Sequence, residues 1–143
     1  MIDRLKLKLD KMENSNFNKV GEYLLELGYN IVIQDTDSEV YVVEKESDGI
    51  NNLFIGVADP ILIIEQYLFT LDNDSSEVFK NLLMKNRDII HGAFALDEVG
   101  DKVIFRDTLQ IENLDLNELE GTLNSLGLLL SEYSDELIEF SKK

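Results

Sequence analysis

Few residues in this sequence have the types and spacing that catalysis requires. His91 is the single histidine, and it stands at the start of a predicted strand with Asp88 as the nearest acid. A general base needs a positioned acid or nucleophile beside it, and the flanking residues offer none beyond Asp88. The sequence has no cysteine, no G-x-S-x-G nucleophile elbow, no phosphate loop and no dinucleotide fingerprint. We therefore expect a structural or surface role for His91, no catalytic residue, and a protein that is not an enzyme.

Two acidic clusters have residue types that calcium loops use. The run 72–75 begins like such a loop, but Glu77 occupies the sixth position, which needs glycine, and Leu83 the twelfth, which needs glutamate. The alternating Asn and Asp residues of 113–117 fail in the same way. Asp and Asn are good helix caps, so capping explains both clusters better. We predict no metal site and no cofactor.

The charge of the chain is strongly negative, with 29 acidic and 13 basic residues and a formal net charge of -16. Such a field repels the phosphates of nucleic acids and anionic membranes, and it favours basic partners. No Lys or Arg occurs from Asp107 to Phe140, which makes this run either a solvated face or an electrostatic docking surface. For Arg106, which precedes it, we expect a local ion pair rather than contact with the carboxylate of another molecule. We predict neither a nucleic-acid nor a membrane partner.

The length of 143 residues suits one domain that buries about two thirds of its unfolded surface. We predict a single domain over 1–143, in which residues 1–14 form an N-terminal helical extension. The longest apolar runs, 61–64 and 126–130, are too short for a membrane span or a signal-peptide core. The absence of cysteine suits a reducing compartment. These features predict a cytoplasmic protein.

The segment 1–14 has two interpretations. Its apolar residues fit a short helical stripe, although Leu5, Leu7 and Leu9 also alternate with lysine as in a strand. We favour the helix. The segment is mildly basic, which suggests a membrane-surface role, but a packed or frayed terminus is the simpler interpretation, because one short stripe does not offset repulsion from an acidic body.

Apolar periodicity and turn signals predict the remaining elements. The last helix repeats apolar residues every three or four positions, which fits either a coiled-coil seam or a helix along a sheet. We prefer the second, because Leu128, Leu129 and Ile138 widen the stripe. In chain order we expect a helix over 17–27, strands over 29–35, 40–46, 53–58 and 61–71, a helix over 77–87, a hairpin over 92–109 and a helix over 115–140.

The boundaries between these elements carry specific signals. Ser15 or Asn16 is the expected cap of the first long helix, Asp74 that of the middle helix, and Asp115 or Asn117 that of the last. Residues 47–52 read as a turn, and Pro60 should interrupt strand pairing because it has no N–H to donate. Short connections favour antiparallel neighbours. The predicted fold is α+β, an antiparallel curved sheet packed against helices in the order (α)-α-β-β-β-β-α-β-β-α.

The stretch from Leu82 to Leu119 resembles the type III secretion chaperone superfamily, the Tir-chaperone fold, and its relatives in the YbjN family. The same order of elements continues from Phe17 to Phe140, so the resemblance covers most of the chain. The matching residues are Leu82, Leu83, Asn86, Gly92, Ala93, Phe94, Ala95, Leu96, Asp97, Gly100, Val103, Ile104, Phe105, Arg106, Leu109, Leu116 and Leu119.

This resemblance implies a small acidic bacterial protein that holds an extended segment of a client protein on a homodimer, without catalysis. It implies strand addition to sheet edges together with apolar pockets. It also places the dimer interface on the middle helix and its neighbouring strand, and it leaves the client-binding residues unassigned. The interface residues expected on this basis are Val78, Phe79, Leu82 and Leu83.

Two other function classes remain open. An acidic inhibitor, immunity protein or nucleic-acid mimic would use the acidic run against a basic partner, and its binding would weaken steeply with salt. A structural coiled-coil partner would use the stripe from Leu116 to Phe140, but the full sheet before it makes this alternative weaker. A chaperone-like module would instead show a dimer and binding that tolerates salt.

Overall fold

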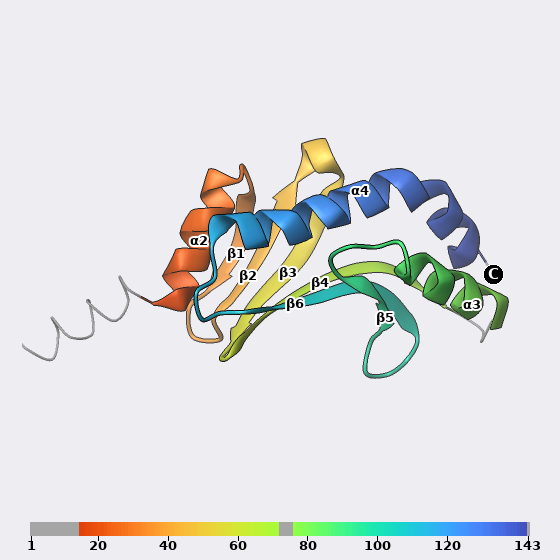
Figure 1. Cartoon of the computed structure of the whole chain (residues 1–143), viewed down its shortest axis with the longest axis horizontal. Coiled ribbons are helices and arrows are strands. Elements are labelled where there is room, and N and C mark those ends of the chain that lie inside the picture. Colours follow the sequence, from red (N-terminus) through yellow and green to blue (C-terminus); the bar gives the residue numbers. More distant parts are fainter. Residues whose placement is uncertain (1–14, 72–75, 143) are drawn as a thin grey trace, which may run out of the picture.

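The computed structural model describes residues 15–71 and 76–142, so the predicted N-terminal helix and the Asp74 cap lie outside the described residues. Its elements are α2 (Asn16–Glu26), β1 (Asn30–Asp35), β2 (Val40–Lys45), η1 (Glu46–Asp48), β3 (Ile50–Ala58), β4 (Ile61–Thr70), α3 (Ser76–Asn86), β5 (Ala93–Leu96), β6 (Lys102–Gln110) and α4 (Leu116–Ser141). The strands form one antiparallel sheet in the order β1-β2-β3-β4-β6-β5. Helices α2 and α4 lie over the same side of this curved sheet, and α3 lies near β5 (Figure 1). The predicted α+β class is confirmed.

Helix α2 begins where the sequence predicts and packs on the sheet through one aromatic pair. Ser15 is its N-cap, and the Ser15 Oγ accepts a hydrogen bond from Asn18 N at 3.1 Å. The rings of Phe17 and Tyr41 stack with centroids 4.2 Å apart, and the Tyr41 hydroxyl donates to Phe17 O at 2.8 Å. A buried tyrosine needs such a partner for its hydroxyl. This pair therefore fastens α2 to β2.

The start of β3 differs from the prediction. The turn predicted over 47–52 is shorter, because η1 and Gly49 complete it and β3 already begins at Ile50. Asn51 and Asn52 therefore belong to a strand and not to a turn. Asn52 has a positive φ of 53°, a left-handed conformation that asparagine adopts more readily than most residues. A short polar residue in this conformation bends the strand locally.

As predicted, Asp59 and Pro60 interrupt the ladder, since β3 ends at Ala58 and β4 begins at Ile61. Asp59 and Pro60 form the tight turn of the β3–β4 hairpin, and Ala58 pairs directly with Ile61 across it. Pro60 stands outside the ladder, so its missing N–H removes no strand hydrogen bond. Its carbonyl instead accepts a hydrogen bond from Ile111 N at 3.0 Å. The proline thus connects the hairpin to the segment before α4.

Helix α4 lies along the sheet, as preferred over a coiled-coil seam. Asp115 is its N-cap, with Oδ1 accepting from Glu118 N at 2.8 Å. The prediction that three residues widen the buried stripe holds for Leu129 but is wrong for Leu128 and Ile138, which are 68% and 53% exposed. The helix meets the sheet along one side only, so these two side chains point elsewhere. Its buried residues are Leu119, Thr122, Leu123, Leu126, Leu129, Leu137 and Phe140.

The β5–β6 turn is closed by the side chain of Asp97. The Asp97 Oδ1 accepts hydrogen bonds from the backbone N–H groups of Lys102 at 3.1 Å, Gly100 at 2.9 Å and Asp101 at 3.2 Å. These donors, the Lys102 N–H above all, hold the pKa of the Asp97 carboxyl below its usual value, although desolvation opposes them. The charged carboxylate is therefore the form that this turn stabilises.

We predict that Asp97→Asn removes a pH-dependent part of the stability. A carboxyl whose folded pKa lies below its unfolded value of about 3.9 stabilises the fold above that value and loses this contribution as pH falls through the folded pKa. Urea unfolding of both proteins should show the variant less stable at about pH 7, with a difference that shrinks below about pH 4. A difference that stays constant over this range would contradict the role of the charge.

Candidate functional site

The four predicted interface residues lie on two different sides of α3. Val78 and Leu82 are 0% and 5% exposed and pack into the core of the subunit. Phe79 is half-buried, and Leu83 is 69% exposed. Each pair is spaced by four residues, as expected for neighbours on one face of a helix. Only Phe79 and Leu83 therefore remain available for contact with another subunit.

Phe79 and Leu83 line an apolar groove between α3 and β5, which we call the α3–β5 groove. Its volume is about 220 Å³. All of the described residues that line it are apolar, and Leu96 at its rim is 44% exposed. Exposed apolar surface gathered in this way is typical of a contact site for another macromolecule. The residues that line it are Phe79, Leu82, Leu83, Phe94, Ala95, Leu96 and Val103.

The edge strand β5 is partly closed to strand addition by Asn86, the last residue of α3. The Asn86 Nδ2 donates to Phe94 O at 3.1 Å, and Phe94 N donates to Asn86 Oδ1 at 2.7 Å. One amide side chain thus satisfies both backbone groups of Phe94, as a neighbouring strand would. The sequence places Asn86 among the residues of the family resemblance, but no pattern in it signals this bond. It follows that β5 offers its apolar face to a partner, and not a free ladder.

Among the described residues, the opposite edge strand β1 has a strand partner on one side only. It pairs only with β2 in the described sheet, and a bulge between Ile31 and Ile33 shifts its register. Val32 and Ile33 are 48% and 52% exposed. Ile33 pairs with Val42 on β2, and Val42 pairs in turn with Phe54 on β3, which is 36% exposed. We call Val32, Ile33, Val42 and Phe54 the β1 surface, an edge strand flanked by apolar side chains, which suits the addition of an extended peptide.

The residues singled out for chemistry have structural partners. His91 is exposed, and its carbonyl accepts a hydrogen bond from Ser125 Oγ at 2.7 Å. Arg106 forms the expected local ion pair, with its Nε 2.9 Å from Glu65 Oε1 on the paired strand. Within residues 15–71 and 76–142, no three His, Asp or Glu side chains gather in a way that could hold a metal ion. The calcium-like run 72–75 lies outside the described residues.

No helix in the described part of the chain has the length and apolar character needed to cross a membrane.

Comparisons with known proteins give one family and several structural relatives. The family model CesT_Tir_1 matches residues 13–143. YbjN from E. coli superposes with a TM-score of 0.63 at 11% identity, over 83% of this chain and 91% of YbjN. A chain of the HopA1–SchA chaperone–effector complex gives a TM-score of 0.57 at 12% identity, over 90% of this chain and 97% of that one.

A third solved structure has the same fold. It is the Yersinia pestis type III secretion chaperone SycH in complex with a stable fragment of YscM2. One of its chains gives a TM-score of 0.55 at 17% identity, over 89% of this chain and 100% of that one. A search of curated protein sequences found no match. At these identities the structural likenesses establish the shared fold.

Proposed function

Because this chain belongs to the CesT_Tir_1 family, we propose that it is a non-catalytic module that binds an extended segment of a client protein on a homodimer. The family match covers 13–143, and two of the similar structures are a chaperone–effector complex and a secretion chaperone with a protein fragment. We carry the client-binding role over from those proteins. The proposed location is the cytoplasm, with neither nucleic acid nor a membrane as partner.

The observation that carries this proposal is a pair of apolar surfaces at opposite ends of the sheet that no described residue covers. The α3–β5 groove presents Leu83 and Leu96, and the β1 surface presents Val32 and Ile33. Exposed apolar surface is unfavourable in water and lowers solubility unless a partner covers it.

We assign the two surfaces to different partners. In the α3–β5 groove, the N–H and C=O of Phe94 are already hydrogen-bonded to the Asn86 side chain. Side-chain packing against a second copy of the chain therefore suits this groove. The β1 surface joins an edge strand to apolar side chains, which is what an added client strand requires. The dimer thus uses one end of the sheet and the client the other.

The test is capture of a partner from native lysate by the tagged protein, with washes at low salt and at roughly 0.5 M salt, where electrostatic screening acts over only a few ångström. We expect a stoichiometric partner that survives the high-salt wash, since apolar and backbone contacts tolerate salt. Ile33→Lys on the β1 surface should reduce its recovery. Gln34→Lys makes the same charge change at the next residue and should leave recovery unchanged.

Two results would count against this function. If no stoichiometric partner is recovered, the protein has no client and the proposed function is wrong. A basic partner that is lost at high salt, and is insensitive to Ile33→Lys, would favour the acidic inhibitor or nucleic-acid mimic instead.

A further inference from the structure

The end of the molecule that α2, β1 and β2 build is acidic. Residues 15–45 contain six acidic and two basic side chains. Lys19 lies over the Tyr23 ring, with its Nζ 5.7 Å from the ring centroid, and Lys45 Nζ donates to a backbone carbonyl at 2.9 Å, so both basic side chains are engaged. This end of the molecule therefore attracts a basic segment. Its acidic residues are Glu22, Glu26, Asp35, Asp37, Glu39 and Glu44.

The two faces of the sheet differ beside β1. Tyr41 stacks on Phe17 of α2 and so faces the helices, whereas its neighbour Val42 faces away, because side chains alternate along a strand. Ile33 pairs with Val42, and Val42 with Phe54, so these apolar side chains share the face that α2 and α4 leave open (Figure 1). The exposed acids of α2 lie on the other side of the sheet. The edge of β1 thus has apolar side chains on one face and carboxylates on the other.

The sequence before α2 has the complementary pattern. Leu5, Leu7 and Leu9 alternate with Lys6 and Lys8. In an extended conformation this alternation puts the leucines on one face and the lysines on the other. Beside β1, the leucines would continue the β1 surface while the lysines would lie on the side of the α2 carboxylates. A shift by one residue would put the lysines against the apolar side chains, so the match selects one of the two faces.

The connection to α2 is long enough for this placement. Helix α2 and β1 are joined by residues 27–29 alone, so α2 folds back beside β1 (Figure 1). The six Cα steps from Leu9 to Ser15 span at most about 20 Å. A strand of six residues, such as β1, is about equally long. Residues 4–9 can therefore reach the β1 edge of their own chain.

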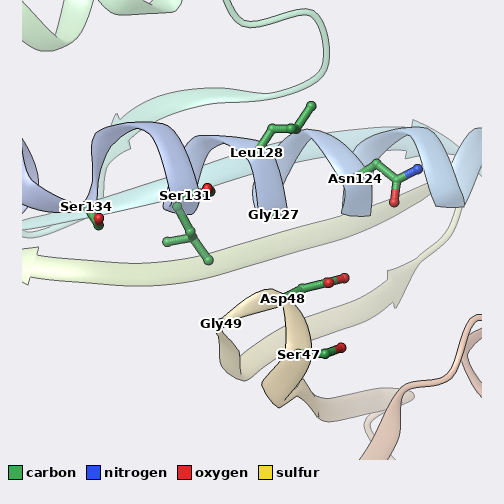
Figure 2. Close-up of a pocket in the computed structure, with 9 residues that line it drawn as sticks. Ser47, Asp48, Gly49, Asn124, Gly127, Leu128, Ser131 and Ser134 are labelled. Carbon is green, nitrogen blue, oxygen red and sulfur yellow. The ribbon is translucent and has the colours of Figure 1, made fainter.

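Two other concave surfaces fit a basic segment less well. One, of about 790 Å³, lies between α4 and the η1 turn, with Gly127 on the helix across from Asp48 (Figure 2). Asp48 is the one charged residue among the described residues that line it, and its Oδ2 is already 3.5 Å from Lys45 Nζ. The described residues that line the α3–β5 groove are apolar and offer no carboxylate. Of these three surfaces, the β1 surface is the one that joins apolar side chains to an available strand edge and acidic neighbours.

We propose that residues 4–9 of this chain add to the edge of β1 as a strand, with the leucines on the β1 surface and the lysines beside the acidic residues of α2. The added strand supplies backbone hydrogen bonds to β1. Its leucines remove from water the apolar side chains of Val32 and Ile33, which are 48% and 52% exposed among the described residues.

This docking regulates client binding. A client strand that adds to the same edge must first displace residues 4–9, and this consequence rests on the proposed function. The N-terminal segment is then an intramolecular competitor. It lowers the apparent affinity for the client by the fraction of molecules in which the edge is occupied.

A cross-link tests the placement, because the sequence has no cysteine of its own. Leu7→Cys and Ile33→Cys are introduced together into the full-length protein, which is then treated with a short bismaleimide. We expect a cross-link within one chain, which keeps the monomer mass on a denaturing gel. Leu7→Cys with Leu83→Cys is the control and should give no such link, because Leu83 is exposed at the other end of the sheet. A covalent dimer from the first pair would assign the segment to a second copy, and the absence of any cross-link would overturn the docking.

Charge reversal tests the contact itself. Lys6→Glu with Lys8→Glu should speed hydrogen exchange of the β1 backbone about tenfold, since two attractive charges become repulsive. Lys80→Glu with Lys142→Glu produces the same net charge and is the matched control. These two exposed lysines belong to α3 and to the C-cap of α4, at the far end of the molecule (Figure 1), so β1 exchange should not change. Equal β1 exchange in all three proteins would contradict the docking.

Client capture separates this inference from the proposed function. The protein with Lys6→Glu and Lys8→Glu should bind the client about tenfold more tightly, because its β1 edge is available. Unchanged affinity would mean that the segment and the client do not compete. If the cross-link forms but no client is recovered, the docking stands and the proposed function fails. If a client is recovered but the cross-link is absent, the docking fails and the proposed function stands.

Discussion

Replacing Gly92 by alanine should destabilise the protein by about 2–5 kcal/mol, the largest effect we expect from a single methyl group. Gly92 has a φ of +82°, which costs an L-residue about 1–2 kcal/mol. Its Cβ would also overlap the ring of Phe105 and stand 3.2 Å from Arg106 O. Phe105 is 0% exposed, so its ring has no free space to move into, and overpacking adds about 1–3 kcal/mol. Urea unfolding of both proteins measures the total loss in the free energy of unfolding.

Gly100 provides the matched control for this prediction. Its φ is +88°, but a Cβ there would meet no atom within 4 Å. Gly100→Ala should therefore show only the same backbone cost, about 1–2 kcal/mol. The difference between the two variants isolates the contact with Phe105. Equal losses at both positions would mean that the Phe105 ring yields, and that Gly92 matters for its backbone alone.

Most of the fold follows from local patterns in the sequence. The caps at Ser15 and Asp115 and the paired strands of the hairpin appear where periodicity and turn chemistry predict them. The resemblance stated for Leu82 to Leu119 is confirmed by the family match over 13–143. These features depend on residues close together in the chain, which is why the sequence reveals them.

What the sequence does not reveal depends on contacts between distant elements. Asn86 accepts a hydrogen bond from Phe94 N, and Gln66 donates one to the carbonyl oxygen of Asn51. Hydrogen bonds of this kind, between a side chain and a distant backbone group, produce no periodic pattern in the sequence. The same holds for the side of α3 that faces the core. Val78 with Leu82 and Phe79 with Leu83 are equally apolar pairs at helical spacing, so only packing against the sheet decides which is buried.

Because α3 has one buried pair and one outward-facing pair of apolar residues, the dimer prediction becomes more specific. Phe79 packs partly against the core, so an aspartate there would test folding as much as association. Leu83 is 69% exposed and sits on the α3–β5 groove, next to the exposed Met84. A stable interface of standard size buries about 800 Å² per partner, with apolar anchors near its centre. Leu83 is the anchor that the described surface offers on α3.

Leu83→Asp should therefore convert the proposed dimer to a folded monomer. A carboxylate placed in a desolvated apolar contact without a partner costs several kcal/mol, so the dissociation constant should rise about a hundredfold or more. Light scattering after size exclusion measures the mass, and circular dichroism verifies the fold. Leu25→Asp is the control, because Leu25 is 61% exposed on α2, away from the groove, and should leave the mass unchanged. If folded Leu83→Asp keeps the mass of a dimer, association uses another surface. The exposed Leu128 and Ile138 of α4 would then be the next positions to change.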